Sequence, residues 1–308
     1  MSRQSQLRVV DPVLTTLLHG YTNAEFVGIN LFPFVPVKKE AGKIPKFGVE
    51  HFKAYNTERA LRANSNRLPA EARTTHPFTL TEHDASYPID YREAQEDILN
   101  TEQFGAFMAQ SAVMLRHELI CAELATTVAN FPVGNKIELS GTGQWTHASS
   151  NPIKTVRDAV EAIRKKIVKR PNTMILSAQS FAALQDHSLI TDRIKYSQLG
   201  VVTVDLLKGI FGIPNIYVAD AVKANDKNVV SDIWGDNTVI AYVAPAKSNV
   251  SRSVFEPSFG YTLRKEGMPE ADKYEEEGGK VTLVRSTDNY TVEIVGASAG
   301  YLIADTNG

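Results

Sequence analysis

Residues 53–74 read KAYNTERALRANSNRLPAEART, and the interpretation of the whole chain depends on this stretch. Its basic side chains are Arg59, Arg62, Arg67 and Arg73, while its apolar residues are small or isolated and show no amphipathic period. Asn, Ser and Pro interrupt it, so it lacks the material for a core of its own. Structureless loops of this length are uncommon in compact domains and are usually functional or disordered. The stretch must therefore be explained by what it packs against.

The segments on either side of this stretch alternate as β-strands do. Phe47 and Val49 alternate before it, and Phe78 and Leu80 alternate after it. A shift of phase follows Val49, as a β-bulge would produce. Two strands that flank a polar tip predict an extended β-hairpin loop over residues 41–83.

The segment before the hairpin, residues 1–40, is expected to form an extended N-terminal arm. It contains one short apolar patch around Leu14, Leu17 and Leu18. Two prolines near its end favour extended backbone.

The clearest predicted helix follows the hairpin, over residues 101–130, which contain no proline. Asn100 is placed to cap it, and Gln103 suits a capping box. At about 1.5 Å per residue the helix would be roughly 45 Å long, so we expect it to serve as a strut. Apolar residues recur every three to four positions and predict one buried face, made of Phe104, Met108, Leu115, Leu119 and Ala122.

Residues 145–249 are expected to form a mixed α/β domain. Its first helix follows a cap at Ser150 or Asn151, with Pro152 in the first turn. The apolar stripe of this helix is Ile153, Val156, Val160, Ile163 and Ile167. Residues 250–308 are β-rich, with candidate strands in FGYTLRKEG, GKVTLVRS, NYTVEIV and AGYLIAD. The predicted fold class is α+β.

The composition narrows the class of protein. The chain has 308 residues, 43% of them hydrophobic, which suggests two domains. The net charge of -2 argues against a protein that mainly coats nucleic acid. Cys121 is the single cysteine, and no signal peptide or run long enough to span a bilayer is visible. We expect a soluble protein made in a reducing cytoplasm.

Three patterns were considered as sites of chemistry. His117 and Cys121 share one helix face but lack a third metal ligand, and a buried small hydrophobe explains Cys121 as well. The GTGQWT segment lacks the features of a phosphate loop. The acidic cluster from Glu82 to Asp97 offers paired carboxylates, but such clusters are more often a solvated face leading into a helix. We predict no catalytic residue, cofactor or metal site, and no enzyme.

The distribution of charge is more informative than these patterns. Basic residues dominate the hairpin, whereas acidic residues dominate the chain from Glu266 onward. Opposite patches on one chain suit self-association, although two independently solvated faces would produce the same pattern. Binding of nucleic acid by the hairpin is less favoured, because few aromatic residues stand among its basic residues. The residues predicted to contact another copy are Lys43, Lys46, Lys53, Arg59, Arg62, Arg67, Arg73, Glu270, Asp272, Glu275, Glu276 and Glu277.

Several sequence segments, occurring in the same order along the chain, resemble those of the tailed-bacteriophage major capsid proteins of the Hong Kong 97-type fold. DPVLTTLLHGYTNAEFVGINLFPFVPV resembles the arm of that family, and GKIPKFGVEHFKAYNTERALRANSNR resembles the loop that overlaps a neighbouring subunit. EPSFGYTLRKEGMPEADKYEEEGG and VEIVGASAGYLIAD resemble its return through the peripheral domain. The resemblance covers nearly the whole chain.

This resemblance implies an organisation in five parts. They are an N-terminal arm (1–40), the extended loop (41–83), a peripheral domain with the spine helix (84–144), an axial domain (145–249) and a return through the peripheral domain (250–308). The loop tip would then pack against the next subunit, which answers the question raised by residues 53–74.

The resemblance also implies a function. Proteins of this family assemble as hexamers and pentamers into an icosahedral head that encloses double-stranded DNA, so the chain would reside in the virion after synthesis in the host bacterial cytoplasm. Scaffolding, portal and decoration proteins are possible partners, and no membrane is involved. Some members form an isopeptide bond from a loop lysine. No lysine occurs from Ala54 through Asn135, so we expect non-covalent stabilisation here.

Two alternatives remain open at this point. An encapsulin-like nanocompartment shares the fold but encloses cargo protein instead of a genome. A hydrolytic or metal-dependent enzyme that uses the Glu82–Asp97 cluster is the remote alternative.

Overall fold

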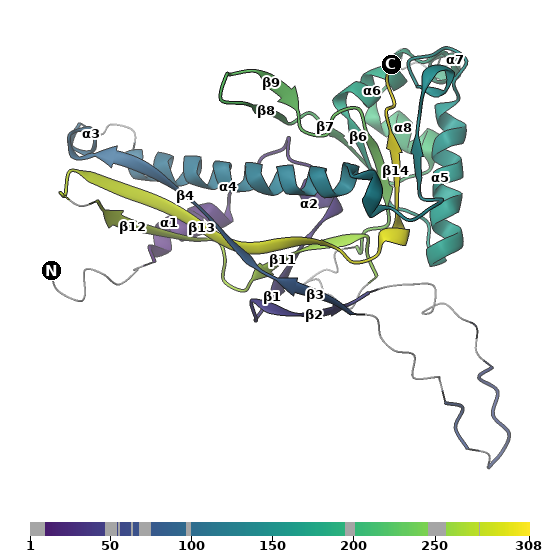
Figure 1. The fold of residues 1–308 in the computed structure, drawn as a ribbon, viewed down its shortest axis with the longest axis horizontal. Coiled ribbons are helices and arrows are strands. Elements are labelled where there is room, and N and C mark those ends of the chain that lie inside the picture. The colour runs from purple at the N-terminus through teal and green to yellow at the C-terminus, as the bar shows by residue number, and fades with distance from the viewer. Residues whose placement is uncertain are drawn as a thin grey trace.

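Two five-stranded sheets and one long helix organise the chain (Figure 1). The computed structural model describes residues 10–46, 54, 56–62, 64–67, 75–96, 100–194, 201–245, 257–276 and 278–308. The mixture of helices and antiparallel and parallel strands confirms the predicted α+β class. No helix in the described ranges is both long and apolar enough to cross a membrane.

The first sheet carries the long helix. Its path is β1 (Phe34–Val37), β11 (Gly260–Lys265), β13 (Val281–Ile294) and β12 (Glu270–Glu275), and β4 (Thr81–Asp90) also pairs with β13. The helix α4 (Thr101–Thr126) lies along β4 and β13, as Figure 1 shows. The predicted long helix is therefore confirmed, although it ends at Thr126 and a short 3-10 turn at Val128–Asn130 follows it.

Strand β13 corrects one prediction. GKVTLVRS, which ends at Ser286, and NYTVEIV, which begins at Asn289, were expected to be separate strands. Instead Ser286, Thr287, Asp288 and Asn289 are all buried within one continuous strand. Pairing with β4 along all four residues, and with β12 at Ser286 and Thr287, holds their backbone extended.

The second sheet has the order β5 (Lys136–Glu138), β14 (Gly300–Ala304), β10 (Thr238–Ala241), β6 (Thr173–Ser177) and β7 (Asn215–Ala219). Residues 250–308 contribute strands to both sheets, because β11, β12 and β13 belong to the first sheet and β14 joins the sheet that contains β6 and β10. Helices α5 (Pro152–Ile167), α6 (Ala178–Asp186) and α8 (Val204–Phe211) pack against this sheet, and α7 (Ser188–Ile194) follows α6.

Helix α5 follows its predicted pattern. Asn151 caps it by accepting a hydrogen bond from the Lys154 backbone, and Pro152 begins its first turn. Four residues of the predicted stripe are buried, and Val160 is half-buried. Three basic residues occupy its last turn and favour the negative end of the helix dipole.

Helix α4 buries only part of the predicted face: Ala122 is buried, and Leu115 and Leu119 are half-buried. Phe104 and Met108, expected inside, are 50% and 43% exposed. Small residues, among them Gly105, Ala106 and Ala109, face the sheet instead. A Cβ on Gly105 would lie 3.0 Å from the Tyr87 ring, so the close approach of helix and sheet selects small side chains at this face.

The N-terminal arm is partly helical, which corrects the prediction of an extended segment. Helix α1 (Pro12–His19) begins after Asp11, whose carboxylate accepts hydrogen bonds from the backbone of its first turn. Leu14 and Leu18 are buried against α4, β4, β12 and β13. A second short helix, α2 (Gly28–Leu31), packs on α4. The predicted apolar patch is therefore the contact between the arm and its own subunit.

Within the described residues, two β-hairpins lie outside the five-stranded sheets. Strands β2 (Ala41–Pro45) and β3 (Thr75–Thr79) form the base of the predicted long loop, and β8 (Val222–Ala224) pairs with β9 (Val230–Asp232). The remaining described elements are the short helix α3 (Tyr91–Gln95) and the 3-10 turns at Gly141–Gly143 and Ala297–Ala299.

Candidate assembly surfaces

The base of the long loop is built into the body of the subunit. Strands β2 and β3 pair from Ala41 opposite Thr79 to Pro45 opposite Thr75, which confirms the predicted hairpin at its base. Ile44, Phe78 and Leu80 are buried in one apolar cluster with residues of β1 and β11. The predicted alternation over residues 47–54 is not testable, because residues 47–53 lie outside the described part.

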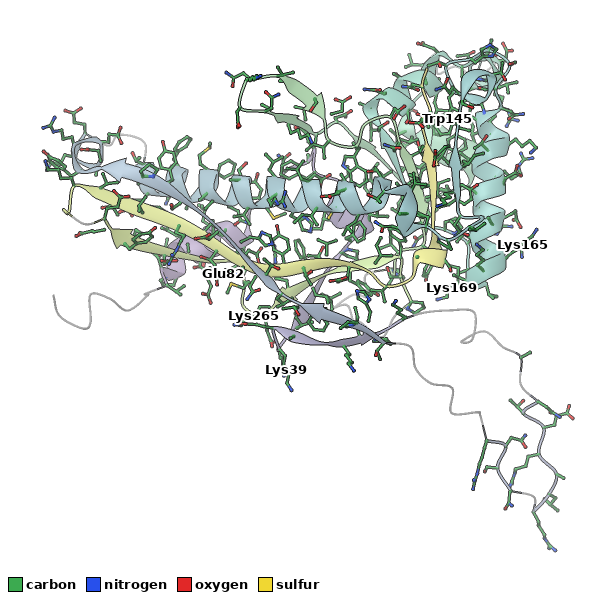
Figure 2. The ribbon with its side chains drawn as sticks, viewed as in Figure 1. Lys39, Glu82, Trp145, Lys165, Lys169 and Lys265 are labelled. Atoms are coloured by element: carbon green, nitrogen blue, oxygen red, sulfur yellow. The ribbon has the colours of Figure 1, made fainter. Side chains whose placement is uncertain are left out.

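Polar contacts also fix this base. The imidazole Nε2 of His76 lies 2.8 Å from a carboxylate oxygen of Glu293 on β13. Lys265 of β11 pairs with Glu40, and this contact raises the pKa of Lys265. Figure 2 shows Lys265 and Glu82 beside the hairpin base. The loop therefore leaves the subunit from a defined position.

The described residues of the loop tip form no core. These are residues 54, 56–62 and 64–67, and all of them are exposed. The Asn66 side-chain amide donates to the backbone oxygens of Asn56 at 3.2 Å and Glu58 at 2.8 Å, which ties the two sides of the tip together. Leu61 lies in the turn and is 89% exposed. Figure 1 shows the tip projecting away from both sheets.

The predicted basic contact residues divide between base and tip. Lys43 and Lys46 are exposed at the base, and Arg59, Arg62 and Arg67 are exposed on the tip. Lys53 and Arg73 lie outside the described residues.

The predicted acidic contact residues are less uniform. Glu275 and Glu276 are exposed at the end of β12, Glu270 is half-buried, and Glu277 lies outside the described residues. Asp272 is only 2% exposed, and both its carboxylate oxygens accept from Arg285, the shorter contact being 2.7 Å. Because its carboxylate is occupied within its own subunit, we remove Asp272 from the predicted contact set.

The predicted acidic contact residues that are exposed, Glu275 and Glu276, belong to one end of the subunit, which we call the distal end. It consists of α3, the first two turns of α4 and the adjoining ends of β4, β12 and β13. Glu275 pairs in register with Thr282, and Asp90 pairs with Val281, so these strand ends are neighbours. Lys273 Nζ reaches Glu102 of α4 at 2.8 Å. Figure 1 places this end opposite the loop tip.

The patterns considered for catalysis have structural explanations. Asp90 and Glu93 form the capping box of α3. His117 is buried, its Nε2 lies 2.8 Å from Thr262 Oγ1, and burial lowers its pKa to about 3. Cys121 is fully buried beside it, and burial raises its pKa. In the described ranges no group of three or more His, Cys, Asp or Glu side chains could hold a metal ion.

Sequence reasoning missed one buried junction, at Glu118. Its carboxylate accepts hydrogen bonds from Val27 N at 3.1 Å, from Gly28 N at 2.8 Å and from Trp234 Nε1 at 2.7 Å. Burial raises the pKa of Glu118, and the three hydrogen bonds oppose that shift. This side chain joins the arm, the long helix and the β9–β10 connection. Its one signal in the sequence was that it directly follows His117, a spacing that begins like a helical zinc motif.

Comparison with known proteins decides the family. The family model described as "Phage major capsid protein E" matches residues 127–287. The major capsid protein of Burkholderia phage BcepMu is 51% identical over 308 residues, covering 100% of both chains. The chain belongs to the phage major capsid protein family.

Solved structures agree with this assignment. The crystal structure of a phage-related protein from Bordetella bronchiseptica RB50 has a TM-score of 0.83 and 32% identity, over 98% of this chain and 99% of that one. The SrpI encapsulin of Synechococcus elongatus matches with a TM-score of 0.54 and 10% identity, over 98% of each chain. The likeness to an encapsulin shows the fold alone, so the encapsulin alternative is less supported than a phage capsid. The chain is a structural shell protein of the virion, and such shells require self-association.

Proposed function

We propose that the chain assembles as hexamers and pentamers into an icosahedral phage head that encloses double-stranded DNA. The loop carries this proposal: a rigidly anchored hairpin base presents an exposed, coreless tip that projects from the subunit. A segment of this kind is stabilised when a neighbouring copy covers it. Its basic residues would lie across the acidic surface of that neighbour.

The contacts between copies are proposed to be non-covalent. The arginines of the tip keep their protons and are poor nucleophiles, so they bind carboxylates without forming a bond. Each exposed ion pair contributes only about 0–1 kcal/mol, and the shell would be held by many repeated contacts. The chain acts as a structural component and not as an enzyme.

Further partners follow from a role in a phage head. A scaffolding protein, a portal and decoration proteins are proposed, with synthesis in the host bacterial cytoplasm. Packaged DNA would be bound through its phosphates without sequence specificity, since phosphate contacts carry no base information.

Electron microscopy of the purified protein, with size-exclusion chromatography and light scattering, tests the assembly. Closed shells, or hexamers and pentamers, are expected. A subunit that stays monomeric, even with a candidate scaffolding protein, would contradict the proposal.

Reversing charge on the tip tests the role of the loop. The triple variant Arg59→Glu, Arg62→Glu, Arg67→Glu is expected to lower shell yield and salt tolerance, because the tip would be repelled by acidic residues. The control reverses Lys223 and Lys227, exposed residues of the β8–β9 hairpin. Unchanged yield and salt tolerance in the triple variant would show that the loop does not make the proposed contact.

A further inference from the structure

The distal end carries an exposed apolar ridge on α4, formed by Phe104, Phe107 and Met108. These side chains are 50%, 48% and 43% exposed, and their spacing of three and four residues places them along one face. Single exposed apolar residues are normal, but a contiguous group marks an interaction site.

Two tyrosine rings of the same subunit contact the side chains of the ridge. The Tyr21 ring lies 5.0 Å from the Phe107 ring, and the Tyr87 ring meets Phe104 edge-on at 5.7 Å. Aromatic contacts of this geometry hold both rings in place. A pre-ordered apolar surface loses little conformational entropy when a partner covers it.

Exposed acidic residues belong to the same distal end as this ridge. They are Glu93 and Glu96 at α3, Glu102 at the start of α4, and Glu275 and Glu276 at the end of β12. The distal end also carries Arg92, Lys273 and Lys280, so its acidic residues outnumber its basic ones. The surface therefore suits an apolar group flanked by positive charge.

The loop tip has that composition. Among the described residues of the tip, Leu61 is a large apolar residue that is 89% exposed, and Arg62 and Arg67 stand near it in the chain. The hydrogen bonds of Asn66 give the tip a defined shape around this turn. Tip and ridge thus match in both polarity and charge.

The two surfaces lie at opposite ends of one subunit. Figure 1 shows the tip beyond the β2–β3 base and the ridge at the far end of α4. The tip of a subunit is therefore directed away from its own ridge, and a second copy must supply the partner surface.

We propose that Leu61 of one copy packs on the Phe104–Phe107–Met108 ridge of a second copy. Arg62 and Arg67 then face the acidic residues of that distal end. The inference rests on the proposed assembly and adds a specific contact to it. It also extends the predicted landing surface from β12 to α3 and α4.

An engineered disulfide tests this contact. The double variant Leu61→Cys, Met108→Cys is assembled and oxidised, because a disulfide forms only where the two Cα atoms approach within about 7 Å. The native Cys121 is fully buried and does not compete. The control pairs Leu61→Cys with Val133→Cys, since Val133 is 90% exposed but lies beyond the other end of α4.

A non-reducing gel of the oxidised shells gives the result. The Leu61/Met108 pair is expected to lose its monomer band to a ladder of linked subunits that a reductant reverses. Both single variants and the control pair are expected to remain monomeric. Shells of the double variant that stay monomeric, or an equal ladder from the control, would overturn the inference while leaving the proposed assembly intact.

Charge reversal gives a second, independent test. Arg62→Glu is expected to lower shell yield, and adding Glu96→Arg is expected to restore it. Restoration by Asp226→Arg, an exposed acidic residue of the β8–β9 hairpin, would contradict the pairing. Failure of the wild-type chain to form shells, even with a candidate scaffolding protein, would instead refute the proposed function itself.

Discussion

Trp234→Phe tests whether the Glu118 junction stabilises the subunit. The substitution keeps an aromatic ring but removes the indole N–H that donates to Glu118 at 2.7 Å. The other two donors are backbone groups of Val27 and Gly28, which the variant leaves unchanged. The lost hydrogen bond lies in a buried site, so its removal is expected to lower the free energy of unfolding by about 1–3 kcal/mol.

The chain provides a matched control in Trp145→Phe. Trp145 and Trp234 are each 1% exposed, so both substitutions remove a similar buried volume. The Trp145 Nε1 makes no hydrogen bond within the described part of the chain. The difference between the two variants therefore isolates the hydrogen bond to Glu118.

Urea titration of unassembled subunits, followed by far-UV circular dichroism, measures the two free energies. Trp234→Phe is expected to be less stable than Trp145→Phe by about 1–3 kcal/mol. Equal losses in the two variants would refute the view that Glu118 stabilises the junction of the arm, α4 and the β9–β10 connection.

Three further predictions concern α4 and the arm. The pKa of His117 is lowered from 6.5 to about 3, so the stability present above pH 6.5 should be lost as the pH falls toward 3. His117→Gln should weaken this dependence and His19→Gln should not, as acid titrations of both variants would show. The Cys121 thiol should react with a thiol reagent only after unfolding; rapid reaction of the native subunit would contradict its burial. Gly28→Ala places a Cβ 2.7 Å from Glu118 Oε2 and should cost about 1–3 kcal/mol, measurable as faster proteolysis of the arm than in Gly20→Ala.

Local sequence patterns correctly predicted those helices and strands whose formation depends mainly on residues close together in the chain. Helix α5 has its cap, its proline and most of its apolar stripe where the sequence placed them. The long helix and the hairpin base were also predictable, because period and turn residues are local signals.

The face of α4 was not predictable from hydrophobicity. Two large apolar residues near its start, Phe104 and Met108, point outward, while Gly105 and Ala109 are buried. Close packing of a helix on a sheet favours small side chains. Glycine and alanine contribute little to a hydrophobic pattern, so such a pattern does not mark them as the buried face. This error hid the ridge that we propose as the landing surface of the loop.

The candidate site was predictable in outline only. Charge located the basic loop, and Arg62 and Arg67 are exposed as expected. The burial of Asp272 could not be predicted without the strand register, because Asp272 pairs with Arg285 across β12 and β13. The role of Glu118 could not be predicted, because its partners Val27 and Trp234 lie far from it in the chain and no local pattern reveals such contacts.

A reconstruction of the assembled particle by electron cryomicroscopy tests the central claim most directly. The account predicts a closed shell in which the tip around Leu61 of each subunit lies on the α3–α4 end of a neighbour. A shell in which that tip contacts only its own subunit or solvent would contradict the proposed contact between copies.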